Sequence, residues 1–121
     1  MSRLYQMLGS GLVLLGAVHM ATTFRAFHML SGAAVWFFGA GIAMALTGAL
    51  NLLNAAYGQQ APGVRWTCRA TNVAMTVFGV LAGVTTRATV GHFVIVLGLA
   101  GGATVLSLWP RALGPRQQRA A

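Results

Sequence analysis

Four long stretches of mostly apolar residues constrain the fold of this 121-residue chain more than any other feature. A helix needs roughly 20 apolar residues to cross the hydrocarbon core of a bilayer. The four stretches cover residues 4–23, 33–54, 68–86 and 91–109. We therefore expect an all-α integral membrane four-helix bundle made of one transmembrane domain, residues 1–121, with a basic cytoplasmic tail at 110–121.

The charged side chains are eight arginines, and the chain has no Asp or Glu. This composition excludes a side-chain carboxylate as acid, base or nucleophile, and it removes the usual oxygen ligands of Ca²⁺ and Mg²⁺. It also excludes proton-coupled transport relayed through a membrane carboxylate, on which the small four-helix multidrug exporters depend. Because the arginines lie at the ends of apolar stretches and do not cluster on a soluble face, we expect no nucleic-acid partner.

The distribution of the arginines predicts the orientation in the membrane. Arginine and lysine are enriched in cytoplasmic loops, and six arginines fall on one side of the expected bundle against two on the other. The larger group is Arg3, Arg65, Arg69, Arg111, Arg116 and Arg119, and the smaller is Arg25 and Arg87. We therefore predict a multi-pass protein of the bacterial inner membrane with both termini and the middle loop, residues 55–66, in the cytoplasm.

The two halves of the chain resemble each other at the expected outer turns, which suggests two pseudo-repeated helical hairpins. Residues 22–28 read Thr-Thr-Phe-Arg-Ala-Phe-His, and residues 85–92 read Thr-Thr-Arg-Ala-Thr-Val-Gly-His. Both contain a Thr pair, then Arg-Ala, then a His. The alternative is that two membrane boundaries recruited the same residue types independently.

Polar residues at the expected cytoplasmic end are predicted to hold helices together. Asn51 and Asn54 end the second stretch, while Asn72 and Thr76 share one face of the third,. Interhelical hydrogen bonds of this kind contribute roughly 0.6–2 kcal/mol each. An inner polar pocket is the alternative interpretation.

The histidines lie on the expected outer side and, with two arginines, define a possible outer-rim ligand site. The five residues are His19, Arg25, His28, Arg87 and His92. The structural alternative is that these side chains only cap helix ends or bind headgroups. We expect no cofactor, but His19 and His92 are the residues that would hold a b-type haem or a transition metal such as copper or zinc. His and Arg together would instead suit an anion or a quinone oxygen.

Three function classes follow from these observations. The first is a non-catalytic scaffold, accessory or binding protein of the membrane, whose partners are the lipid bilayer and a second copy or a larger membrane protein. The second is a transporter or channel for an anionic or neutral solute, which the apolar middle of the stretches disfavours. The third is a His-dependent protein that binds haem, metal or quinone. Without carboxylates the sequence favours a protein that is not an enzyme.

Overall fold

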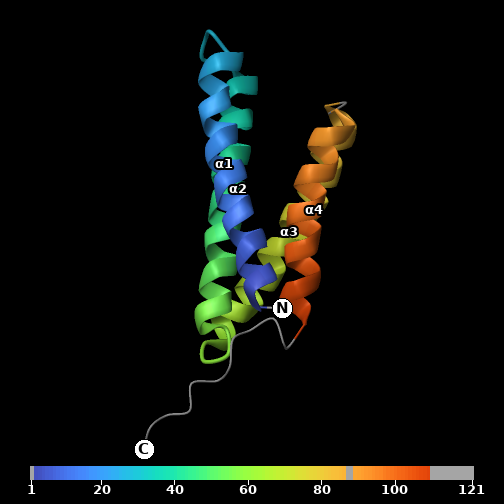
Figure 1. Cartoon of the computed structure of the whole chain (residues 1–121). Coiled ribbons are helices and arrows are strands. Elements are labelled where there is room, and N and C mark those ends of the chain that lie inside the picture. Colours follow the sequence, from blue (N-terminus) through green and yellow to red (C-terminus); the bar gives the residue numbers. More distant parts are fainter. Residues whose placement is uncertain (1, 87–88, 110–121) are drawn as a thin grey trace, which may run out of the picture.

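The computed structural model describes residues 2–86 and 89–109, and helices account for nearly all of them (Figure 1). Each of the four helices in this described part is long and apolar enough to cross a membrane. They are α1 (Ser2–Ala26), α2 (Gly32–Tyr57), α3 (Pro62–Thr85) and α4 (Val90–Leu108). The prediction of an all-α, multi-pass four-helix membrane protein is therefore confirmed. Arg87 and the tail at 110–121 lie outside the described residues.

The helix ends follow local sequence signals, one of which shortens the expected middle loop. The hydroxyl of Ser31 accepts a hydrogen bond of 3.2 Å from the Ala34 N–H and caps α2. Pro62 occupies the first turn of α3, where its fixed φ suits the helix and its missing N–H costs nothing,. The third helix therefore begins six residues before the apolar stretch at 68, and the predicted loop at 55–66 is mostly helical.

Helices α1 and α2 pack through glycines, with their backbones in contact. A Cβ atom on Gly16 would lie 2.5 Å from the Gly41 carbonyl oxygen and 2.6 Å from the Ala45 nitrogen. One on Gly48 would lie 2.5 Å from the Gly9 carbonyl oxygen. Small residues permit this close approach, which drives helix association in lipid through van der Waals contact. The first hairpin is consequently a tightly joined unit.

Helices α3 and α4 form a second hairpin that is held by side chains. The Thr76 and Thr104 hydroxyls lie 2.9 Å apart, and the Arg69 Nε donates a 3.1 Å hydrogen bond to the Ser107 carbonyl oxygen. The Phe93 ring packs directly on Gly83. The second hairpin therefore uses a different kind of contact from the first.

The two hairpins meet at one end and diverge toward the other (Figure 1). They are close where α1 begins, α4 ends and the α2–α3 loop lies, which we call the closed end. They separate toward the α1–α2 loop, which we call the open end. Near the closed end, Leu12 of α1 packs against Ala100 and Ala103 of α4. The two helical pairs are therefore arranged in a V (Figure 1).

Replacement of Gly16 by Ala tests the glycine contact. We expect Gly16→Ala to lower the free energy of unfolding by about 1–3 kcal/mol, because the added methyl overlaps the α2 backbone,. The measurement is reversible unfolding in detergent micelles, followed by circular dichroism. Gly98 of α4 is the matched control, since nothing lies within 4 Å of its added Cβ. Gly98→Ala should change stability by less than about 0.5 kcal/mol, and equal losses in both variants would contradict the packing described.

Candidate functional site: a cleft between the hairpins above a buried amide pair

A reciprocal pair of hydrogen bonds joins the hairpins at the closed end. The Asn51 Nδ2 donates to the Asn72 Oδ1 at 2.7 Å, and the Asn72 Nδ2 donates to the Asn51 Oδ1 at 2.9 Å. Both side chains are almost completely buried. The Asn51 amide also donates to the Thr47 carbonyl oxygen at 2.8 Å, within its own helix. The pair thus connects α2 of the first hairpin to α3 of the second.

Tyr5 and Cys68 extend this network to α1. The Asn54 Nδ2 donates to the Tyr5 hydroxyl at 2.8 Å, and that oxygen lies 3.4 Å from the Cys68 Sγ. The Cys68 thiol in turn lies 3.5 Å from the Asn51 Oδ1. Neither Tyr5 nor Cys68 is among the polar contacts predicted from the sequence, where no spacing signal links them to the asparagines. Both side chains are buried. The closed end therefore contains a network of buried polar groups that hydrogen-bond to one another.

The four polar residues predicted at this end form three separate contacts. Asn51 and Asn72 come together directly, whereas Asn54 binds Tyr5 and leaves its own Oδ1 buried without a partner among the described residues. Thr76 joins Thr104 within the second hairpin. These contacts link α1, α2 and α3 to one another, so the network holds the helices together at this end.

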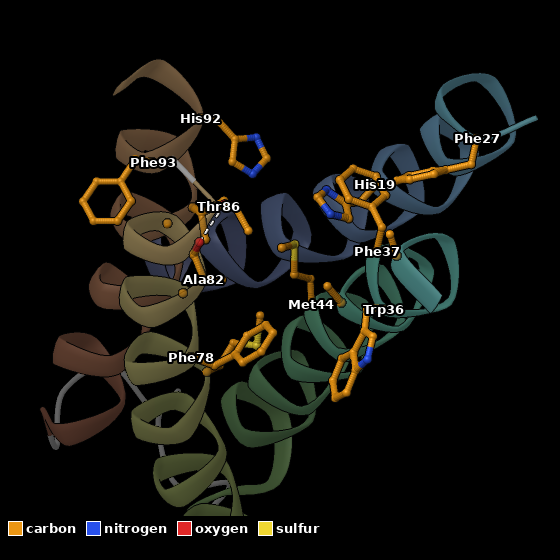
Figure 2. Close-up of a pocket in the computed structure, with 16 residues that line it drawn as sticks. His19, Phe27, Trp36, Phe37, Met44, Phe78, Ala82, Thr86, His92 and Phe93 are labelled. Carbon is orange, nitrogen blue, oxygen red and sulfur yellow. Dashed lines mark hydrogen bonds between the residues drawn. The ribbon is translucent and has the colours of Figure 1, made fainter. Parts of the chain in front are cut away.

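A cavity of about 360 Å³ lies above the network, between the diverging hairpins (Figure 2). All four helices line it. Its walls carry large apolar side chains, among which Phe37 and Met44 come from α2 and Met75 and Phe78 from α3. Each pair shares a helix face, because residues three or seven positions apart lie on the same side. This spacing is a sequence signal that could have identified the walls, although it is equally typical of ordinary core packing.

Two imidazoles from different hairpins share this cavity. The ring centroids of His19 on α1 and His92 on α4 lie 5.7 Å apart, with an angle of 36° between the ring planes. His19 is buried and stacks on Phe37 with a centroid distance of 3.8 Å, while His92 is exposed. Thr86 also lines the cavity, and its hydroxyl donates a hydrogen bond of 2.6 Å to the Ala82 carbonyl oxygen (Figure 2). The polar side-chain groups available in this apolar cleft are thus the two imidazoles and the indole N–H of Trp36,.

The remaining residues of the predicted outer rim do not join this pair. Arg25 is exposed in the last turn of α1, six residues after His19 and therefore roughly 240° around the helix,. His28 lies in the α1–α2 loop, where it lines a separate groove with Phe24 and Phe38. Arg87 lies outside the described residues. Of the four predicted rim residues that the structure describes, it brings together His19 and His92, because helical phase and loop direction turn Arg25 and His28 elsewhere.

Comparison with known proteins finds no match: no family model, no curated protein and no solved structure is similar to this chain. The fold and the cleft define a multi-pass helical membrane protein with an apolar cavity between two hairpins.

A double-mutant cycle tests the amide pair. We expect Asn51→Leu and Asn72→Leu each to lower the free energy of unfolding by about 1–3 kcal/mol, because each leaves a buried amide without its partner. The double variant should lose less than the sum of the two single variants, since no unpaired amide remains. The free energy of unfolding of the parent and the three variants is measured in mild detergent with increasing dodecyl sulfate. Strictly additive losses would show that the two side chains do not interact.

Proposed function

We propose that this protein binds a lipid-soluble molecule that carries a flat ring with hydrogen-bond acceptors, for which a quinone is the simplest chemical model. The observation that carries the proposal is the cleft in which two imidazoles from different hairpins face a cavity with largely apolar walls. A binding role of this kind belongs to the third, His-dependent class of the sequence analysis, and the imidazoles supply the specificity.

The size and lining of the cavity support this class of ligand. Small-molecule sites have volumes of about 300–1,000 Å³ and combine apolar or aromatic walls with a few polar groups that fix orientation. The cavity of about 360 Å³ lies in this range and has Trp36, Phe37 and Phe78 on its walls. Aromatic side chains pack favourably against a flat ring at centroid distances of roughly 4.5–7 Å. A single quinoid head group therefore suits the space.

The imidazoles match the acceptors of such a ring. A neutral imidazole has one N–H donor and one acceptor nitrogen, so His19 and His92 can each donate one hydrogen bond to a carbonyl oxygen. The chain contains no Asp or Glu that would bind these imidazoles more strongly. Phe37 fixes the plane of the His19 ring by stacking on it, which reduces the entropy lost when a ligand binds.

Tryptophan fluorescence tests the proposal in a variant whose only tryptophan lines the cleft. Trp66→Phe and Trp109→Phe leave Trp36 as the reporter, and the titrant is a benzoquinone with a short alkyl tail. We expect saturable quenching in detergent micelles. His19→Ala with His92→Ala should weaken binding by about tenfold or more, the equivalent of ~1.4 kcal/mol.

His28→Ala is the matched control, because this imidazole lies outside the cleft. Its affinity should equal that of the parent protein. Quenching that rises linearly without saturation would indicate simple partition of the quinone into the micelle and would contradict the proposal. Equal affinity in the double histidine variant would also contradict it.

The open end is proposed to face away from the cytoplasm, in keeping with the excess of arginines at the closed end. Single cysteines at Met29 and Gln60, both exposed, test this orientation in a Cys68→Ser background. In intact cells, a membrane-impermeant maleimide should label Met29→Cys directly and label Gln60→Cys only after the membrane is permeabilised. The reverse pattern would place the closed end outside.

A further inference from the structure

We propose that His19, His92 and Met44 form a binding site for one Cu(I) ion in the cleft. The two imidazoles belong to α1 and α4, and the thioether belongs to α2, so the ion would join the two hairpins near the open end. The site uses the same imidazoles as the proposed quinone-type ligand, but its formation does not depend on that ligand.

The separation of the two imidazoles fits a shared metal ion. Metal–nitrogen bonds to histidine are about 2.0–2.1 Å long, so two imidazoles bound to one ion hold their ring centres roughly 5–6 Å apart. The observed centroid distance between His19 and His92 is 5.7 Å. Stacking on Phe37 fixes the plane of the His19 ring, whereas exposed His92 is free to adjust. The centroid separation thus matches that of two imidazoles on one ion, and rotation of the exposed His92 side chain would bring a ring nitrogen to it.

Met44 supplies a soft third ligand. Its side chain is buried and lines the same cavity. Long side chains on a helix lean toward the helix N-terminus, and α2 begins at the open end. The thioether is consequently directed into the cleft toward the level of the imidazoles (Figure 2). Thioether ligands select Cu(I), while carboxylate and water oxygens select harder ions.

Charge also favours a monovalent ion. The three ligands are neutral and the chain contains no Asp or Glu, so a bound ion keeps its full charge in an apolar cleft. An uncompensated charge is costly in such surroundings, and the electrostatic cost rises steeply from one charge to two. Cu(I) thus fits this donor set better than Zn²⁺ or Cu(II), although imidazole alone would accept all three.

The test is a Cu(I) competition titration of the full chain in detergent micelles under anaerobic, reducing conditions, with the chromophoric chelator bicinchoninate as competitor. We expect the protein to withdraw one equivalent of Cu(I) from the chelator. His19→Ala and His92→Ala should each weaken binding by about tenfold or more, as loss of a group that orients a metal ligand already does. Met44→Leu, which conserves side-chain volume, should also weaken it. X-ray absorption of the loaded protein should show nitrogen and sulfur neighbours.

Two matched controls separate this site from surface binding. His28→Ala and Met29→Leu remove the same side-chain types from the α1–α2 loop, outside the cavity, and both should bind Cu(I) as the parent protein does. Circular dichroism melting of each variant shows whether it folds. No withdrawal of Cu(I) from the chelator would overturn the proposal, as would unchanged affinity in a folded histidine variant or stronger binding of Zn²⁺. Because the assay contains no quinone, its outcome is independent of the quinone titration.

Discussion

The reciprocal hydrogen bonds between Asn51 and Asn72 are the interaction on which the arrangement of the four helices depends. A primary amide has two donors and an acceptor oxygen, and in the interior of a membrane protein water is not available to satisfy them. Pairing the two amides across α2 and α3 therefore fixes which residues of the two hairpins lie at the same depth. A slip of either helix along its axis would leave both groups unpaired, at a cost of about 1–3 kcal/mol for each.

This attachment at the closed end has a large effect because each hairpin is joined internally. Backbone contacts at Gly16 and Gly48 hold α1 against α2 along much of their length. Hydroxyl and side-chain contacts hold α3 against α4. The two units are joined near one end by Asn51, Asn72 and Tyr5, and they separate toward the other end (Figure 1). The cleft that contains His19 and His92 lies on the side away from these polar contacts.

The sequence predicted the helices and their hairpin pairing because apolar stretches and arginine positions are local signals. It also identified Asn51 and Asn72 as candidate contacts, since both lie near the same predicted depth. The divergence of the hairpins could not be predicted, because it depends on crossing angles that glycine positions alone do not specify. The sequence also grouped His28 with His19, because the direction of a loop is not specified by residue spacing. Only the direction of the α1–α2 loop shows that His28 lines a different surface. Met44 carried no signal that distinguished a cleft residue from a core residue.

The apolar walls of the cleft have a consequence for how selective any site there can be. Around a membrane protein the competing solvent is the acyl chain of a lipid, which is as apolar as Phe37 or Met44. Transfer of a lipid-soluble molecule from the bilayer into the cleft therefore gains little from the hydrophobic effect. Discrimination between such a molecule and a lipid tail falls to the few atoms that a hydrocarbon chain cannot satisfy. In the part of the cleft that the structure describes, those atoms are chiefly the ring nitrogens of His19 and His92.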